Sequence, residues 1–150
     1  MVCDQTSPTL INCRFVHNNA QSGGGVFVLE GSPTFSGCTF ENNHAYDGFA
    51  GGLYNYLGVT NLVGCTFKGN TSGGGGGFFN YPEYDTTLSV KGCHFEGNHA
   101  LDNEGWFGHA GGMAHRRGLL ILEDSTFVAN AVSLRNANII KMNVARIGTV

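Results

Sequence analysis

Charged residues are scarce in this sequence and long apolar runs are absent, and both features exclude classes of protein. Asp, Glu, Lys and Arg make up 13% of the 150 positions, about half of the usual fraction in soluble domains. A formal net charge of −3 offers no basic surface for a polyanion, so nucleic-acid binding is disfavoured. No stretch approaches the roughly 20 apolar residues of a membrane-spanning helix. No basic segment followed by an apolar one opens the sequence, so no signal peptide is visible.

Glycine and asparagine are abundant instead. The sequence has 24 Gly and 15 Asn residues, together about a quarter of the chain. Each glycine costs about 1 kcal/mol in a helix interior, so glycine at this density excludes a helical bundle. Hydrophobic residues reach 41% and include 11 Phe, enough to bury a core. The composition therefore favours a β protein with Gly and Asn at its turns.

A six-residue pattern recurs five times, with Cys or Ser first, Phe third and Asn sixth. The first position is occupied by Cys13, Cys38, Cys65, Cys93 and Ser125. The third position is occupied by Phe15, Phe40, Phe67, Phe95 and Phe127. The sixth position is occupied by Asn18, Asn43, Asn70, Asn98 and Asn130. Successive copies are 25, 27, 28 and 32 residues apart, which is the spacing of a structural repeat.

Each repeat predicts three short strands. The Cys and Phe of the pattern are two residues apart, so they point to the same side of a first strand. A Gly pair, at positions 24–25, 51–52, 76–77 and 111–112, opens a second strand. A third strand carries the apolar residue that stands three positions before the next Cys. The Gly or Asn immediately before the Cys suits a corner that requires a positive φ.

Stacked repeats of this kind predict an all-β fold, a right-handed parallel β-helix of about five coils. Each strand pairs in register with its equivalent about 4.8 Å away, so that Phe lies on Phe and Asn forms a ladder of side-chain amides. We expect one domain over residues 1–150, with regular coils over 10–130 and a degenerate coil or C-terminal extension over 131–150. Neither end shows a capping helix, so we expect either a fragment of a longer solenoid or a chain that stacks end to end.

The pattern Phe-x-x-Asn-x-Ala followed by Gly-Gly and a hydrophobic residue resembles the repeat of the polymorphic outer-membrane protein family. It occurs at 15–20, 40–45 and 95–100, while the third copy has Ser72 in place of Ala. The resemblance implies an extracellular or cell-surface module used in adhesion. Its partner would be a host or neighbouring surface protein or a glycan.

The cysteine column permits a disulfide but favours free thiols. A Cα separation of about 4.8 Å lies inside the range of a disulfide. Parallel side chains in a stack, however, point in the same direction rather than at each other. No Cys-x-x-Cys pair gives the spacing of a metal site. Ser125 continues the column, so a small buried side chain suffices there, and we expect no metal and no cofactor.

Histidine and threonine columns have similar interpretations. His44 and His99 occupy one repeat position, but Thr71 separates them, which favours surface corner residues over a metal pair. An outward column between Cys and Phe contains Thr39, Thr66 and Thr126, as in ice-binding solenoids, but the column is interrupted at positions 14 and 94. Ice binding is therefore disfavoured.

Many parallel β-helices cleave polysaccharides, which requires clustered carboxylates or a carboxylate-bound cation beside a base. The candidate residues here are Glu83, Asp85, Asp102, Glu104, Arg116 and Arg117. The two arginines lie one coil beyond Glu83 and Asp85, an arrangement more typical of a solvated ion-pair cluster. A polysaccharide lyase or glycoside hydrolase remains the alternative hypothesis.

Aromatic residues in the two longest insertions favour a binding function. Trp106 and Phe107 lie in the insertion at 99–110, and Tyr81 and Tyr84 lie near the shorter one. Flat rings exposed on loops stack on sugars or anchor protein interfaces, although Trp106 could instead cover its own loop. The candidate ligand-binding residues are Trp106, Phe107, His109, Tyr84, Glu83, Asp85 and Arg116. We therefore expect a non-catalytic structural or adhesive surface module.

Overall fold

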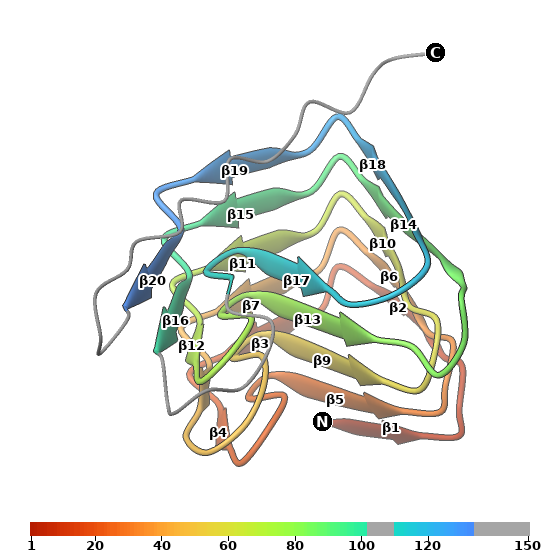
Figure 1. Ribbon diagram of the computed structural model, residues 1–150, viewed down its shortest axis with the longest axis horizontal. Coiled ribbons are helices and arrows are strands. Elements are labelled where there is room, and N and C mark those ends of the chain that lie inside the picture. The colour runs from red at the N-terminus through yellow and green to blue at the C-terminus, as the bar shows by residue number, and fades with distance from the viewer. Residues whose placement is uncertain (102–109, 134–150) are drawn as a thin grey trace.

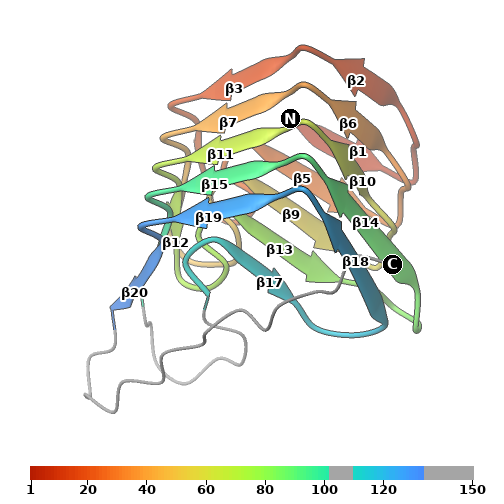
Figure 2. The same cartoon turned by 90° about the horizontal axis from the view of Figure 1, so that it is seen from above.

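The computed structural model describes residues 1–101 and 110–133. Twenty short β-strands wind there as a solenoid, and equivalent strands of successive coils form four parallel sheets (Figure 1). Turned by 90°, β3, β7, β11, β15 and β19 are successive rungs of one wall (Figure 2). Four turns separate β1 from β17, and β17–β20 form the last described set of strands. The predicted all-β parallel solenoid is confirmed.

Each sheet contains five strands, in the order in which the coils stack. Sheet A contains β1 (Val2–Asp4), β5 (Val26–Leu29), β9 (Leu53–Tyr56), β13 (Phe78–Tyr81) and β17 (Met113–His115). Sheet B contains β2 (Thr9–Ile11), β6 (Thr34–Ser36), β10 (Asn61–Val63), β14 (Thr87–Lys91) and β18 (Leu119–Glu123). Sheet C contains β3 (Arg14–Val16), β7 (Thr39–Glu41), β11 (Thr66–Lys68), β15 (His94–Glu96) and β19 (Thr126–Val128). Sheet D contains β4 (Asn19–Ala20), β8 (His44–Ala45), β12 (Thr71–Ser72), β16 (His99–Leu101) and β20 (Ala131–Ser133).

Each coil contributes a strand to four sheets rather than the three expected, and sheet D is the additional one. The residue after each ladder asparagine donates its backbone N–H to the ladder residue of the preceding coil. His44 N donates to Asn18 O at 2.8 Å, and Thr71 N donates to Asn43 O at 2.9 Å. This pairing extends the chain into a fourth strand of two or three residues. His44 therefore lies in a strand rather than at the predicted corner, and so does His99 in β16.

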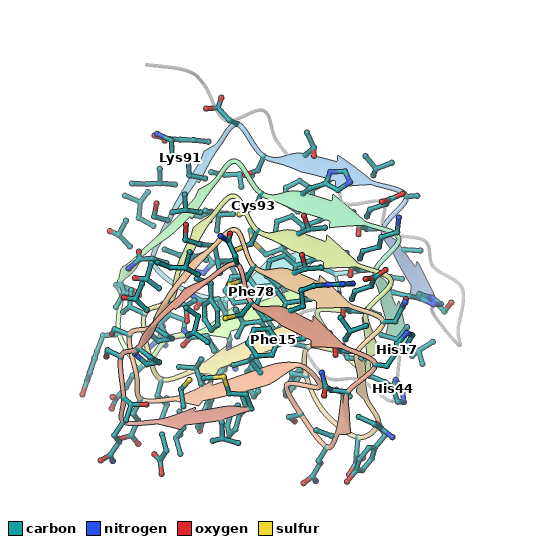
Figure 3. All side chains as sticks on the ribbon, turned by 180° about the vertical axis from the view of Figure 1, so that it is seen from behind. Phe15, His17, His44, Phe78, Lys91 and Cys93 are labelled. Atoms are coloured by element: carbon teal, nitrogen blue, oxygen red, sulfur yellow. The ribbon has the colours of Figure 1, made fainter. Side chains whose placement is uncertain are left out.

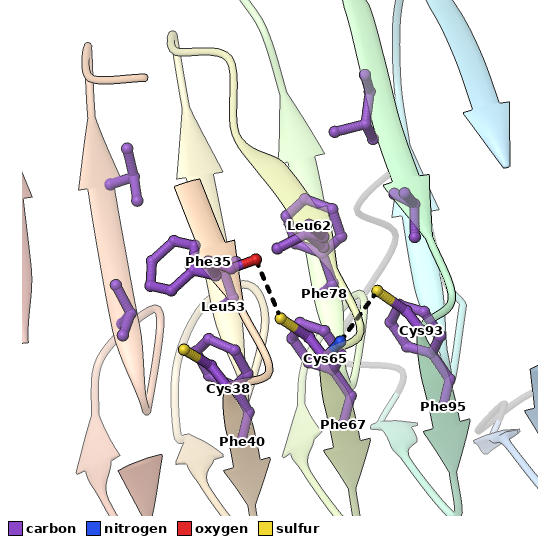
Figure 4. Packing of buried hydrophobic residues seen from close by; sticks show 14 of the residues in the cluster. Phe35, Cys38, Phe40, Leu53, Leu62, Cys65, Phe67, Phe78, Cys93 and Phe95 are labelled. Carbon is purple, nitrogen blue, oxygen red and sulfur yellow. Dashed lines mark hydrogen bonds between the residues drawn. The ribbon is translucent and has the colours of Figure 1, made fainter. Parts of the chain in front are cut away.

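The predicted phenylalanine stack runs through the interior of the coil. The ring centroids of Phe40 and Phe67 are 4.6 Å apart, and those of Phe67 and Phe95 are 4.7 Å apart, with the rings nearly parallel (Figure 4). Phe95 stacks on Phe127 at 4.6 Å in the same way. Figure 3 shows Phe15, Phe78 and Cys93 inside the coil and His44 at its periphery. The stack supplies much of the apolar surface that the fold buries.

The predicted asparagine ladder runs parallel to the phenylalanine stack. Oδ1 of Asn43, Asn70, Asn98 and Asn130 accepts the backbone N–H and the side-chain Nδ2 of the ladder residue one coil earlier, at 2.9–3.0 Å. From Asn43 onward, Nδ2 also donates to the carbonyl of a phenylalanine in the preceding coil. Asn43, Asn70 and Asn98 are fully buried. Their amides can be buried because both ends are hydrogen-bonded.

Glycine is required at two kinds of position. Gly64 and Gly92 precede the cysteines with φ near +60°, the left-handed conformation predicted for this corner. The Gly pair has a different constraint, which is the close approach of neighbouring coils. A Cβ atom on Gly77 would lie 2.4 Å from the carbonyl oxygen of Gly112. The pair therefore lets consecutive coils pack against each other at the entrance to sheet A.

All five cysteines are free thiols in the structure, and all except Cys13 are buried. The backbone N–H of Cys65 donates to Sγ of Cys93 at 3.4 Å (Figure 4). One coil later, the N–H of Cys93 donates to Oγ of Ser125 at 3.0 Å. Ser125 thus performs the same acceptor role as Cys93. The hydrogen bond with the Cys93 thiol, together with burial, raises the pKa of Cys65, which disfavours its reactive thiolate form.

Candidate functional site

The outer face of sheet A carries a row of aromatic side chains, which we call the aromatic face. Strand alternation places Val26 and Val28 in the core, where both are fully buried, and turns Phe27 outward. The same alternation continues along β9 and β13. The aromatic face consists of Phe27, Tyr54, Tyr56, Phe79 and Tyr81. It is the largest concentration of outward aromatic side chains in the described residues.

The rings of the aromatic face contact one another from coil to coil. Phe27 stacks on Tyr54 with the ring centroids 5.3 Å apart, and Tyr56 lies 5.5 Å from Tyr81. Tyr54 meets Phe79 edge-to-face at 5.6 Å. Phe49, in the loop between β8 and β9, lies over this group and stacks on Phe79, with the two ring centroids 4.7 Å apart. Such mutual packing holds the rings in fixed positions.

A shallow hollow of about 430 Å³ opens on this face. Its lining combines aromatic rings with polar groups from the neighbouring turn, and consists of Gln21, Ser22, Phe27, Tyr54 and Tyr56. Gln21 Nε2 donates to Asp47 Oδ2 at 3.4 Å, which orients the amide. Ser22 Oγ accepts the backbone N–H of Phe49 at 3.4 Å. The hollow therefore offers apolar ring surface beside oriented amide and hydroxyl groups.

Tyr54 has the most perturbed acidity on this face. Burial raises the pKa of its phenol, the nearby Tyr56 and Tyr81 raise it further, and Arg116 partly opposes them. At neutral pH the hydroxyl of Tyr54 therefore keeps its proton and remains a hydrogen-bond donor.

The segment after β13 forms the ion-pair cluster that the sequence predicts. Arg117 Nε lies 3.9 Å from Asp85 Oδ1, and Arg117 donates from its guanidinium to the backbone carbonyl of Glu83 at 2.9 Å. Arg116, the arginine proposed as a ligand contact, instead lies 4.4 Å over the ring of Tyr81. Arg116 thereby extends the aromatic face by one coil.

This cluster lacks the burial that a catalytic acid requires. The side chain of Asp85 is 84% exposed and that of Arg117 is 59% exposed. Glu83 and Tyr84 are also exposed. A carboxylic acid that donates a proton near neutral pH needs its pKa raised by burial or by a like charge. The geometry is that of a solvated surface ion pair.

The outer face of sheet C has a different character. Arg14 pairs with Glu41 at 3.3 Å and Lys68 pairs with Glu96 at 3.0 Å, across neighbouring coils. These side chains are partly or fully exposed and stand on the same wall as the threonine column. The face is a charged, solvated surface, which leaves sheet A as the better candidate for ligand contact.

The remaining predicted residues fall into two groups, those that lie outside the described residues and the two histidines, which lie within hydrogen-bonding distance of hydroxyl groups on sheet D. Trp106, Phe107 and His109, together with Asp102 and Glu104, lie outside the described residues. His44 Nδ1 lies 2.7 Å from Thr71 Oγ1, and His99 Nε2 lies 2.7 Å from Ser133 Oγ. Within residues 1–101 and 110–133, no three His, Cys, Asp or Glu side chains are grouped so that they could hold a metal ion.

A comparison with known protein families shows the family to which the chain belongs. The family model described as "Right handed beta helix region" matches residues 1–139. The chain belongs to the right-handed β-helix family. The match confirms the predicted handedness and spans all four sheets. No curated protein and no solved structure matches this chain. In the part of this β-helix that the structure describes, no helix is long and apolar enough to cross a membrane.

Sequence reasoning missed most of the hollow of this β-helix. It identified Tyr81 and Tyr84 as exposed aromatics; Tyr84 is 69% exposed and is not among the residues packed in the aromatic face. The signal that could have found the site is the second residue after each Gly pair. That position holds Phe27, Tyr54 and Phe79, and strand alternation turns it outward.

Proposed function

We propose that this β-helix is a non-catalytic adhesive surface module that binds glycans through the hollow on the aromatic face. The observation that carries the proposal is the combination of Phe27, Tyr54 and Tyr56 with the amide of Gln21 and the hydroxyl of Ser22. A sugar ring has an apolar face edged by hydroxyl groups, so it is matched by aromatic surface beside hydrogen-bonding groups. The resemblance to polymorphic outer-membrane protein repeats supports a cell-surface or extracellular location.

The packing of the aromatic face favours binding with little rearrangement. Tyr54 is 7% exposed and is fixed by contacts to Phe27 and Phe79. Rings that are already ordered lose little conformational entropy when a ligand stacks on them. The hollow is shallow and open, which suits one or two sugar units of a longer chain on a partner's surface, whether that of a host or of a neighbouring cell.

Tyr56→Ala tests this proposal. The substitution removes one wall of the hollow and leaves the hydrophobic cluster inside the coil untouched, so the fold should persist while glycan affinity falls about tenfold or more. The measurement is binding of the full chain to an immobilised panel of neutral and acidic polysaccharides. Tyr84→Ala is the matched control, because it removes an exposed tyrosine outside the hollow and should leave affinity unchanged. Equal polysaccharide binding by the wild-type chain and Tyr56→Ala would contradict the proposal.

The alternative is a carbohydrate-active enzyme that uses the segment around Arg117 and Asp85. It is favoured by the position of this ion pair beside the aromatic face, next to Arg116 and Tyr81. The same polysaccharides, incubated with the chain, would then yield new reducing ends or unsaturated uronates. Product formation that Asp85→Asn abolishes would establish the enzyme and overturn the non-catalytic proposal.

A further inference from the structure

The loop that packs against the hollow contains a chemically labile pair of residues, Asp47 and Gly48. The chain has five Asp residues, of which only Asp47 precedes a glycine, and none of its 15 Asn residues does so. In such a pair the backbone nitrogen of the glycine can attack the side-chain carboxyl and close a succinimide ring. Glycine obstructs this attack least, because it has no Cβ atom. Asp47 is therefore the residue of this sequence most prone to such a rearrangement.

The structure leaves both reacting groups of this pair available. Asp47 is exposed, at the bend between β8 and β9. The backbone N–H of Gly48 donates no hydrogen bond within residues 1–101 and 110–133, whereas the N–H groups of Asp47 and Phe49 both have acceptors. The nitrogen of Gly48 can therefore turn toward the carboxyl without giving up an acceptor.

Packing against the hollow requires glycine at position 48. A Cβ atom on Gly48 would overlap Oγ of Ser22 and would lie 2.9 Å from the backbone carbonyl oxygen of Gln21. Both of these residues line the hollow. A larger residue at position 48 would displace them, so the labile pair is a consequence of the close packing between this loop and the hollow.

The carboxylate of Asp47 holds the amide of Gln21 in place. Asp47 Oδ2 accepts a hydrogen bond from Gln21 Nε2 at 3.4 Å, and the backbone N–H of Asp47 donates to the carbonyl of Gln21 at 3.4 Å. The loop is also anchored before and after the pair. Tyr46 donates its backbone N–H to the preceding coil at 3.0 Å, and the carbonyl of Phe49 accepts the N–H of Gly23 at 2.9 Å. An atom inserted between these anchors must therefore displace at least one of these contacts.

We propose that Asp47 is a modification site that isomerises to isoaspartate and thereby loosens the hollow. The backbone nitrogen of Gly48 forms a bond to Cγ of Asp47, the bond between Cγ and the carboxyl hydroxyl breaks, and one water molecule leaves with the amide proton. A second water molecule then opens the ring. Its attack on the backbone carbonyl carbon of Asp47 breaks the bond from that carbon to nitrogen and gives isoaspartate, whereas attack on Cγ restores aspartate. One water molecule is lost and one is gained, so the mass of the chain is unchanged.

Isoaspartate at position 47 changes the geometry beside the hollow. Its main chain runs through Cβ and Cγ, which adds one carbon between the two anchored sides of the loop, and its carboxylate is attached directly to Cα. The carboxylate then no longer reaches Gln21 as the Asp47 side chain does, and the longer loop displaces Phe49 over the aromatic face. A hollow whose groups are less ordered binds a ligand more weakly. The effect on glycans rests on the proposed function, whereas the isomerisation itself does not.

Ageing of the full chain at neutral pH, in water enriched in the heavy oxygen isotope, tests the proposal. We expect isoaspartate that carries the heavy isotope to accumulate in the proteolytic peptide that contains Asp47, as measured by mass spectrometry and by an isoaspartate-specific methyltransferase. The peptide that contains Asp85 is an internal control and should stay unmodified, because Asp85 is 84% exposed but precedes Thr86. Absence of isoaspartate at Asp47, or equal amounts in the two peptides, would overturn the proposal.

Two variants test the route through the succinimide ring. Asp47→Asn closes the same ring with loss of ammonia and should convert faster, because a neutral amide is attacked more readily than a carboxylate. Asp47→Glu keeps a carboxylate but would need a six-membered ring, so it should not convert. Circular dichroism and thermal unfolding establish that each variant is folded. Conversion of Asp47→Glu at the wild-type rate would overturn the succinimide route.

The consequence for the hollow is measured on the isomerised fraction, separated from the unmodified chain by ion exchange. The ring resonances of Phe49 should shift in this fraction, and its polysaccharide affinity should fall about tenfold. Aged Asp47→Glu should keep the affinity that it has when fresh. Unshifted Phe49 resonances together with unchanged affinity would overturn the loosening of the hollow. If neither fresh nor aged wild-type chain binds any polysaccharide, the proposed function fails, while isoaspartate at Asp47 and the Phe49 shift still decide this proposal.

Discussion

Asn43 and Asn70 are joined by two hydrogen bonds to a single oxygen. Oδ1 of Asn70 accepts the backbone N–H of Asn43 and its side-chain Nδ2, both at 3.0 Å. The remaining amide hydrogen of Asn43 donates to the carbonyl of Phe15 at 2.8 Å. One side chain thus connects three consecutive coils without leaving a polar atom unpaired. The ladder therefore holds the coils together, and it reports on their stacking rather than on ligand binding.

Replacing a central ladder residue should be costly. Asn70→Ala leaves the backbone N–H and one side-chain amide hydrogen of Asn43 without an acceptor in a fully buried site. At about 1–3 kcal/mol for each unsatisfied group, the free energy of unfolding should fall by about 3 kcal/mol or more. Urea denaturation measures the change. Asn61→Ala, on the outer side of β10, is the control and should cost less than about 0.5 kcal/mol; equal losses in both variants would contradict the role of the ladder.

Glycine at the entrance to sheet A is predicted to be irreplaceable for steric reasons. Gly77→Ala places a Cβ atom 2.4 Å from the carbonyl oxygen of Gly112, so the two coils must separate. Gly97→Ala meets no atom within 4 Å and bears only the strain of its φ of +60°, about 1–2 kcal/mol. Thermal unfolding should show a clearly larger loss for Gly77→Ala. If the two variants lose the same stability, backbone strain alone explains why glycine is required at both positions.

The cysteine column should tolerate serine better than valine. Cys93 accepts the N–H of Cys65 through its sulfur, and Ser125 shows that a hydroxyl performs this role one coil later. Cys93→Ser keeps an acceptor, whereas Cys93→Val preserves the apolar volume but leaves the N–H unpaired at a cost of about 1–3 kcal/mol. Denaturant unfolding of the two variants measures the difference. A more stable Cys93→Val protein would mean that packing dominates this column.

Stability should depend on pH through His115. Burial lowers the pKa of this histidine, which lies 3.0 Å from Nδ2 of Asn80 through its Nδ1 atom. The unfolded chain therefore binds the proton more readily than the folded one. Stability is full above the ordinary histidine pKa near 6.5 and decreases as the pH falls below it. His115→Asn continues the column formed by Asn55 and Asn80. Urea midpoints at pH 7.5 and pH 5.5 should differ less in that variant, and an unchanged difference would rule out His115 as the source.

The repeated elements of this fold could be predicted because the same residues recur in the same order every 25 to 32 residues. The interval between Phe40 and Phe67, or between Asn43 and Asn70, indicates a coil in which identical residues stack. Sheet D could not be predicted in this way. Its strands, such as Thr71–Ser72, have only two or three residues, too few for an alternation of apolar and polar side chains.

The candidate site was harder to predict than the fold. Phe27 and Tyr54 stand in apolar runs that indicate a strand, but those runs do not show which of their side chains face outward. Phe49 joins them from a loop, through contacts that no spacing encodes. The ion pair between Arg117 and Asp85 was predictable, because both residues lie at equivalent ends of consecutive coils. Its exposure could be seen only in the structure.

The most direct test of glycan binding at the aromatic face is an NMR titration of the full chain with oligosaccharides taken from the polysaccharides it retains. If glycans bind there, the ring resonances of Phe27, Tyr54 and Tyr56 should shift together and saturate, while the oligosaccharides remain uncleaved. Shifts confined to the segment at 81–85, or oligosaccharide cleavage during the titration, would contradict the account.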